Sequence, residues 1–179
     1  MDASLLSRST YLITFLVAVA IVDVTKRRIP NWLTLSAAIV ALVLNFSKTG
    51  SDGALTSSAG LLTGLAAFLP FYLARGFGAG DVKAMGAVGA FLGPQGALLA
   101  AAWTLVAGAI GALLVLIVRR EYLALRSLVT RWLLRGYALY AAGQAHPLAG
   151  GPNDPTRRRF PYGLAIASGT LVSMAWRTP

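Results

Sequence analysis

Long apolar runs with almost no charge restrict most strongly what this chain can fold into. A helix needs roughly 20 mostly apolar residues to cross a bilayer. The candidate stretches, of which the fourth is the shortest, are residues 5–24, 32–46, 54–74, 84–95, 97–118 and 160–176. Only 12% of the 179 residues are charged, about half the share of a soluble domain. The pattern predicts an all-α membrane protein, a single transmembrane domain over residues 1–179 with six transmembrane helices.

The Lys and Arg residues orient these helices. If the N-terminus is outside, the inner segments are residues 25–31, 75–83 and 119–159, and they hold all but three of the 16 basic residues. Basic residues collect in cytoplasmic loops, so both termini are expected on the outer, periplasmic side. Five helices would put the first and the last of these segments on opposite sides. This placement also accounts for the net charge of +10, so nucleic-acid binding is not expected.

The longest inner segment, residues 119–159, is rich in arginine. Between Glu121 and Ala142, apolar residues recur at helical spacing and Arg126 and Arg135 fall on the opposite side. This pattern predicts an amphipathic helix. Its apolar face would lie either on the inner membrane surface or against the other helices.

Small residues also predict how the apolar helices pack. Gly60 and Gly64 form one GxxxG pair and Gly89 and Gly93 form another. Small residues let helix backbones approach closely in lipid, so both pairs are expected at helix contacts. Pro94 follows Gly93 and should end the short fourth helix.

The side chains available for chemistry are few. The chain has no cysteine and a single histidine, His146, which excludes thiol nucleophiles and thiolate zinc sites and argues against a histidine triad or a multi-histidine metal site. No cofactor and no metal are expected. Catalysis would then depend on the six acidic residues, which are Asp2, Asp23, Asp52, Asp81, Glu121 and Asp154.

Asp23 and Asp81 stand apart from the other acidic residues. Asp2 and Asp52 fall in outer loops, and Glu121 and Asp154 lie in the arginine-rich segment, whereas Asp23 and Asp81 end and begin apolar helices at the inner face. Taken singly, Asp23 would pair with an arginine and Asp81 would cap a helix.

As a pair, the two aspartates predict hydrolysis. Neighbouring carboxylates cannot both ionise readily, so one keeps its proton. The ionised one can take a proton from a water that attacks a peptide carbonyl, and the other can donate to the carbonyl oxygen or the leaving amine. Two alternatives remain, a small transporter or proton relay that uses the same pair and a scaffold subunit without catalysis.

Three motifs give the chain a resemblance to a known family. Residues 23–31 (DVTKRRIPN), 78–83 (GAGDVK) and 160–169 (FPYGLAIASG) resemble, in the same order, motifs of the type IV prepilin peptidases, which are GxGD membrane aspartyl proteases. The resemblance covers about residues 10–178. It implies that Asp23 and Asp81 are the catalytic pair. It also implies a bacterial inner membrane location, with the active site at the cytoplasmic side.

The resemblance implies further roles and partners. The motif residues expected to position the substrate are Gly78, Gly80, Lys83, Ile29, Pro30, Asn31, Pro161, Tyr162 and Gly163. The implied substrates are prepilins or pseudopilins, cut between a basic leader and an apolar helix. Whether the enzyme forms a homo-oligomer is left open.

The chain differs in one respect from the larger members of the family. Larger members carry an extra cytoplasmic domain with paired CxxC zinc motifs, and they also methylate the new pilin N-terminus. Here residues 25–31 form the whole link between the first two helices, and cysteine is absent. The chain resembles the short enzymes of tight-adherence (Flp-type) pilus systems, and methyltransferase activity is not expected.

Overall fold

The computed structural model describes residues 3–26, 28–74, 76–118, 130 and 162–177. The chain divides into two compact units, Met1–Gly108 with Pro161–Pro179, and Ala109–Phe160. Apart from residues 109–118 and 130, the described residues lie in the first unit. The predicted amphipathic helix within residues 119–159 lies outside the described residues, as does Pro161.

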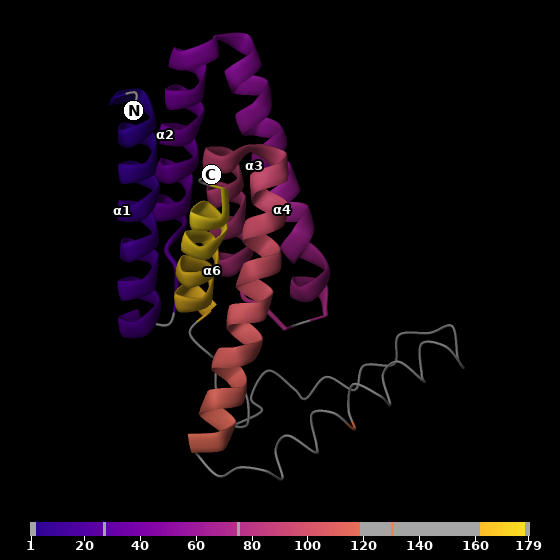
Figure 1. Cartoon of the computed structure of the whole chain (residues 1–179). Coiled ribbons are helices and arrows are strands. Elements are labelled where there is room, and N and C mark those ends of the chain that lie inside the picture. The colour runs from indigo at the N-terminus through magenta and orange to yellow at the C-terminus, as the bar shows by residue number, and fades with distance from the viewer. Residues whose placement is uncertain (1–2, 27, 75, 119–129, 131–161, 178–179) are drawn as a thin grey trace, which may run out of the picture. The chain divides into compact units, whose positions relative to one another are not determined.

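The regular secondary structure of the described residues is helical. In chain order the helices are α1 (Ala3–Lys26), α2 (Asn31–Thr49), α3 (Ser51–Leu73), α4 (Ala79–Val118) and α6 (Tyr162–Arg177) (Figure 1). α1 packs against α2 and α6, and α2 packs against α3. Within α1 to α4, each helix has a segment long and apolar enough to cross a membrane, and α6 is a shorter apolar helix. The helices and their apolar character confirm the prediction of an all-α membrane protein.

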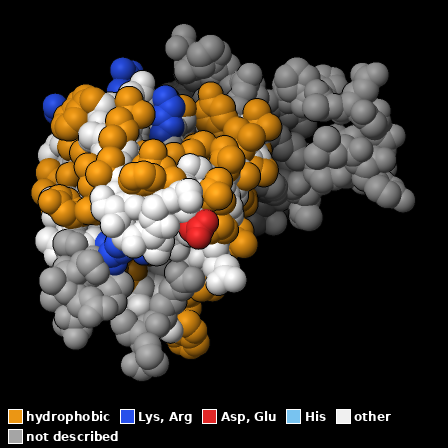
Figure 2. Space-filling model, turned by 90° about the horizontal axis from the view of Figure 1, so that it is seen from above, with side chains coloured by type: hydrophobic (Ala, Val, Ile, Leu, Met, Phe, Trp, Pro, Cys, Tyr) orange, Lys and Arg blue, Asp and Glu red, His pale blue; other side chains and the backbone are white. Residues whose placement is uncertain are grey.

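The outward faces of the helices are apolar. Trp32, Leu35, Leu62 and Leu73 each expose more than three fifths of their surface, and Figure 2 shows hydrophobic side chains over much of the described surface. Exposed apolar area on this scale would favour aggregation in water, whereas lipid accommodates it. The surface therefore agrees with the apolar sequence pattern.

The first half of α4 is the centre of the first unit. Residues 84–91 are all buried, so this half-helix is covered on every side, as expected for a helix that is apolar all round. The core also includes Leu12, Leu16 and Val19 from α1 and Phe68 from α3.

Glycines set the contact between α3 and α4. A Cβ atom on Gly60 would run into the backbone carbonyl of Gly89, and one on Gly64 would run into the carbonyl of Met85. Larger residues would force the two helices apart. The prediction that the GxxxG pairs serve close helix packing is confirmed.

α4 is interrupted where the sequence predicted an end to the fourth apolar stretch. Gly93 has φ 73° and ψ 177°, a conformation open essentially to glycine alone. Pro94 has no N–H, so the carbonyl of Ala90, four residues earlier, loses its helical partner. The Asn45 side-chain amide (3.0 Å) and the Ser57 hydroxyl (2.9 Å) donate to that carbonyl instead. Side chains of α2 and α3 thus satisfy the polar group that the break exposes.

Candidate active site

Asp23 lies in the last turn of α1, and only 6% of its surface is exposed. Its Oδ2 accepts a hydrogen bond of 2.7 Å from the backbone N–H of Gly163. Gly163 is the second residue of α6, where backbone N–H groups have no partner within the helix. The carboxylate therefore occupies the position at a helix N-terminus that favours negative charge. The expected single-residue alternative for Asp23, pairing with an arginine, is not found within the described ranges.

The absence of a side chain at position 163 makes this contact possible. A Cβ atom there would lie 2.7 Å from the Cβ atom of Asp23 and 2.9 Å from its Oδ2. Real Cβ atoms do not approach so closely, so a larger residue would displace Asp23 or α6. The glycine of the PYG motif is explained by this contact with the first motif.

Asp81 is the third residue of α4 and is partly buried. Its Oδ2 accepts a hydrogen bond of 2.9 Å from the N–H of Gly78, and its own N–H donates to the Gly78 carbonyl at 3.1 Å. A side chain at this helical position that reaches back to the residue before the helix is the arrangement of a capping box. Asp81 therefore does cap α4, and the cap fixes the direction of its carboxylate.

An aromatic cluster holds the start of α6 beside these groups. The Tyr162 ring centroid lies 4.4 Å from that of Phe77, and Phe77 lies 4.9 Å from Phe68 and 5.2 Å from Phe71. Phe77 belongs to the glycine-rich loop before α4. Phe77 was not among the predicted site residues, because its contact with Tyr162 arises only when α6 packs beside this loop.

Both aspartates are connected to the first turn of α6. The Tyr162 ring packs on Phe77, which precedes the Gly78 that binds Asp81, and the next residue, Gly163, binds Asp23. The first aspartate comes from the end of α1 and the second from the start of α4. The structure thus brings both predicted catalytic residues and two residues of the PYG motif to one end of the helices.

Residues 29–31 join α2 to the start of α4. Ile29 is buried, and a Cβ atom on Gly80 would lie 3.1 Å from the Cβ atom of Ile29. Pro30 precedes α2 in an extended conformation. Asn31 Oδ1 accepts a hydrogen bond of 2.9 Å from Lys83 Nζ. The IPN and GAGDVK motifs are therefore contact partners.

The structure separates the predicted positioning residues into two groups. Gly78 and Gly163 bind the aspartates, and Tyr162 lies beside Gly163 in the chain. Ile29, Asn31, Gly80 and Lys83 make the contact between the two motifs. Pro30 precedes α2, and its carbonyl accepts a hydrogen bond from the Leu33 N–H. Over the described ranges, no three His, Cys, Asp or Glu side chains cluster as metal ligands would.

The comparison with known families agrees with this geometry. Residues 10–116 match the type IV leader peptidase family, a segment that holds Asp23, Asp81 and the motifs around them. The chain belongs to the type IV leader peptidase family. The resemblance seen in the sequence is confirmed, and membership indicates a membrane protease of the leader peptidase type.

The PYG motif lies beyond the segment that matches the type IV leader peptidase family. The motif contacts the matched segment in the structure, because Tyr162 packs against Phe77 and Gly163 binds Asp23. Neither the curated proteins nor the solved structures compared with the chain gave a match.

Proposed function

We propose that the chain is an aspartyl endopeptidase that removes the leader from Flp-type prepilins or pseudopilins, with Asp23 and Asp81 as its catalytic pair. The observation that supports this proposal is the connection of both aspartates to the start of α6, directly through Gly163 for Asp23 and through Gly78 and the neighbouring Phe77 ring for Asp81. Membership in a peptidase family supports hydrolysis over transport or a purely structural role.

The chemistry needs only the two carboxylates and a water. The ionised aspartate takes a proton from water as the oxygen attacks the scissile carbonyl carbon, while the protonated aspartate donates to the carbonyl oxygen. Collapse of the tetrahedral intermediate breaks the C–N bond, and the amine leaves with a proton from the pair. Gly163 and Gly78 hold one oxygen of each carboxylate, which orients the aspartates before substrate arrives.

The membrane topology in this proposal places the site at the cytoplasmic face of the bacterial inner membrane. It takes the two halves of α4 as separate spans, so that six helices cross and both termini are periplasmic. The basic residues Lys26, Arg28 and Lys83 lie at the end of the helices that carries the aspartates, which supports this orientation. The whole chain then forms one transmembrane peptidase domain.

The substrate in this proposal has a basic leader and an apolar helix, and the scissile bond lies between them. A scissile bond at that boundary lies near the membrane surface. It is therefore accessible to carboxylates at the ends of helices, and not to carboxylates deep inside the bilayer. Methylation is not part of the proposed function, because residues 25–31 form the whole link between the first two helices and the sequence contains no cysteine.

Single substitutions test the pair. Asp23→Asn and Asp81→Asn each keep an acceptor oxygen for Gly163 or Gly78 but lose the ionisable group. Each should lower cleavage of a co-expressed prepilin by more than about 100-fold, scored as the gel shift between precursor and mature pilin. Asp52→Asn, in the first turn of α3, is the matched control and should cleave normally. Near-normal cleavage by either of the first two variants, at equal membrane levels, would remove that residue from the proposal.

A further inference from the structure

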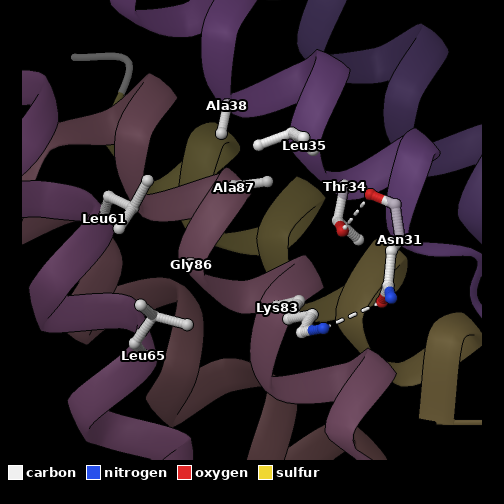
Figure 3. Close-up of a pocket in the computed structure, with 9 residues that line it drawn as sticks. All are labelled: Asn31, Thr34, Leu35, Ala38, Leu61, Leu65, Lys83, Gly86 and Ala87. Atoms are coloured by element: carbon white, nitrogen blue, oxygen red, sulfur yellow. Dashed lines mark hydrogen bonds between the residues drawn. The ribbon is translucent and has the colours of Figure 1, made fainter.

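Lys83 follows Asp81 by only two residues in α4, yet the two side chains lie on nearly opposite sides of the helix. Each residue of an α-helix is turned by about 100° from the one before it, so two residues amount to more than half a turn. Lys83 lines a groove of about 300 Å³ between α2, α3 and α4 (Figure 3), and no aspartate is among the described residues that line it. Lys83 is therefore placed to act on Asp81 only through the helix that carries both.

The Lys83 ammonium group binds the first residue of α2. Its Nζ donates a hydrogen bond of 2.9 Å to Asn31 Oδ1, drawn as a dashed line in Figure 3. Hydrogen bonds with a charged donor are stronger than neutral ones. Asn31 is itself held at the start of α2, because its carbonyl accepts the Thr34 hydroxyl at 3.0 Å. This bond therefore joins the start of α4 to the start of α2.

The residue before Asp81 packs on the same segment. A Cβ atom on Gly80 would lie 3.1 Å from the Cβ atom of Ile29 and 3.4 Å from its carbonyl oxygen, so the backbone of α4 passes close to Ile29. Ile29 is buried, and so is Val82 on the other side of Asp81 in the chain. Asp81 thus lies between two contacts with residues 29–31, one made by the preceding residue and one made by Lys83.

α2 also binds the far end of the same half-helix. The Asn45 side-chain amide donates to the Ala90 carbonyl at 3.0 Å, and residues 84–91 of α4 are buried. The first half of α4 is therefore tied to α2 by one polar contact near each end. Asn31 belongs to an element that is already fixed on α4, which makes it a suitable anchor for Lys83.

We propose that Asn31 and Lys83 are positioning residues that hold the first turn of α4, and with it Asp81, and that neither of them contacts the substrate or transfers a proton. This inference rests on the proposed function, in which Asp81 is catalytic. The Gly78 cap orients the carboxylate on its own helix, and the bond to Asn31 orients that helix on α2. A catalytic group must be held to within about 0.5 Å of its productive position, so loss of this bond slows turnover.

Substitutions at the two ends of the bond test the proposal. Asn31→Leu and Lys83→Met each remove it, and each should lower kcat about tenfold with little change in KM for prepilin in proteoliposomes. The double variant should be no slower than the slower single variant, because both changes remove one interaction. Lys83→Arg and Asn31→Asp keep the donor and the acceptor and should retain most of the rate. Lys48→Met, at an exposed position of α2, is the matched control and should equal wild type.

A direct chemical role for Lys83 would give a different pattern. If the ammonium group contacted the substrate or donated a proton, Lys83→Met would lose far more activity than Asn31→Leu. The two losses would also multiply in the double variant. Either result would overturn the proposal, as would full activity of both single variants.

Hydrogen exchange gives a readout that does not depend on turnover. The N–H groups of Asp81 and Val82 donate to the Gly78 carbonyl at 3.1 and 3.4 Å, so their exchange reports the order of the first turn of α4. In full-length protein in nanodiscs, Asn31→Leu and Lys83→Met should each raise the exchange rate of residues 78–85 several-fold, and Lys48→Met should not. Exchange equal to wild type in both variants would contradict the positioning role. Absence of cleavage by wild type would instead contradict the proposed function, whatever the exchange rates are.

Discussion

The Oδ2 atom of Asp23 lies 2.7 Å from the backbone nitrogen of Gly163, a residue 140 positions further along the chain. This hydrogen bond joins the end of α1 to the start of α6 and leaves no room for a side chain at position 163.

Gly163→Ala should abolish most activity without unfolding the protein. The added Cβ atom would lie 2.7 Å from the Cβ atom of Asp23, so the carboxylate or α6 must move by a fraction of an ångström to an ångström. Displacement on this scale costs about 100-fold in rate. Prepilin cleavage measures the loss. Leu164→Ala, at the exposed next position, is the control and should retain wild-type cleavage. Full activity of Gly163→Ala would show that the contact does not position Asp23.

Phe77→Ala should lower kcat by about tenfold because it removes the ring against which Tyr162 packs. Aromatic pairs of this kind contribute about 0.5–1.5 kcal/mol beyond the area they bury. Phe77→Tyr keeps the ring and should restore the rate, which separates positioning from a general packing defect. Phe46→Ala, at an exposed position of α2, controls for loss of an aromatic residue. Equal kcat values for Phe77→Ala and wild type would contradict this role.

Removal of both donors to the Ala90 carbonyl should destabilise the protein. Asn45→Ala or Ser57→Ala alone leaves one donor and should cost about 0.5–1.5 kcal/mol. The double variant leaves a buried carbonyl unpaired and should cost more than the sum of the two. Thermal unfolding in detergent measures the free-energy differences, with Ser47→Ala, at an exposed position, as control. Strict additivity of the two substitutions would argue against a shared acceptor.

Thr104→Val and Thr170→Val should leave the protein equally stable or stabilise it by up to about 1 kcal/mol. Both hydroxyls are buried, and neither has a hydrogen-bond partner among the described residues. Burial of an unpaired hydroxyl costs free energy that valine, of similar shape, does not incur. Thr34→Val is the contrast, because its buried hydroxyl donates to the Asn31 carbonyl at 3.0 Å, and this variant should be less stable. A clear loss of stability in Thr104→Val would indicate a partner for that hydroxyl.

The apolar runs and glycine pairs made much of the fold predictable from the sequence. α4 begins at Ala79, whereas the predicted apolar stretch began at residue 84. The difference arises because Asp81 caps the helix, so the polar residues of the GAGDVK motif become helical. Apolarity alone does not reveal a helical turn that is stabilised by a cap.

The sequence predicted which residues belong to the candidate site, but not which of them contact one another. Charge patterning put Asp23 and Asp81 at one face, yet it could not show that Gly163 binds Asp23 or that Lys83 bonds to Asn31. These pairs are far apart in the chain, and their geometry depends on how the helices pack. Phe77 was missed because its role arises only when α6 lies beside the loop before α4.

The hydrogen bond between Asp23 and Gly163 can form only after both helices have been synthesised. A growing chain inserts its N-terminal helices first, so α1 enters the membrane with its aspartate long before the residue that orients it has been made. Until α6 arrives, the carboxylate lacks its backbone donor. With Asp23 in the proposed catalytic pair, the peptidase gains activity only once α6 has been inserted, which protects neighbouring membrane proteins from an immature protease.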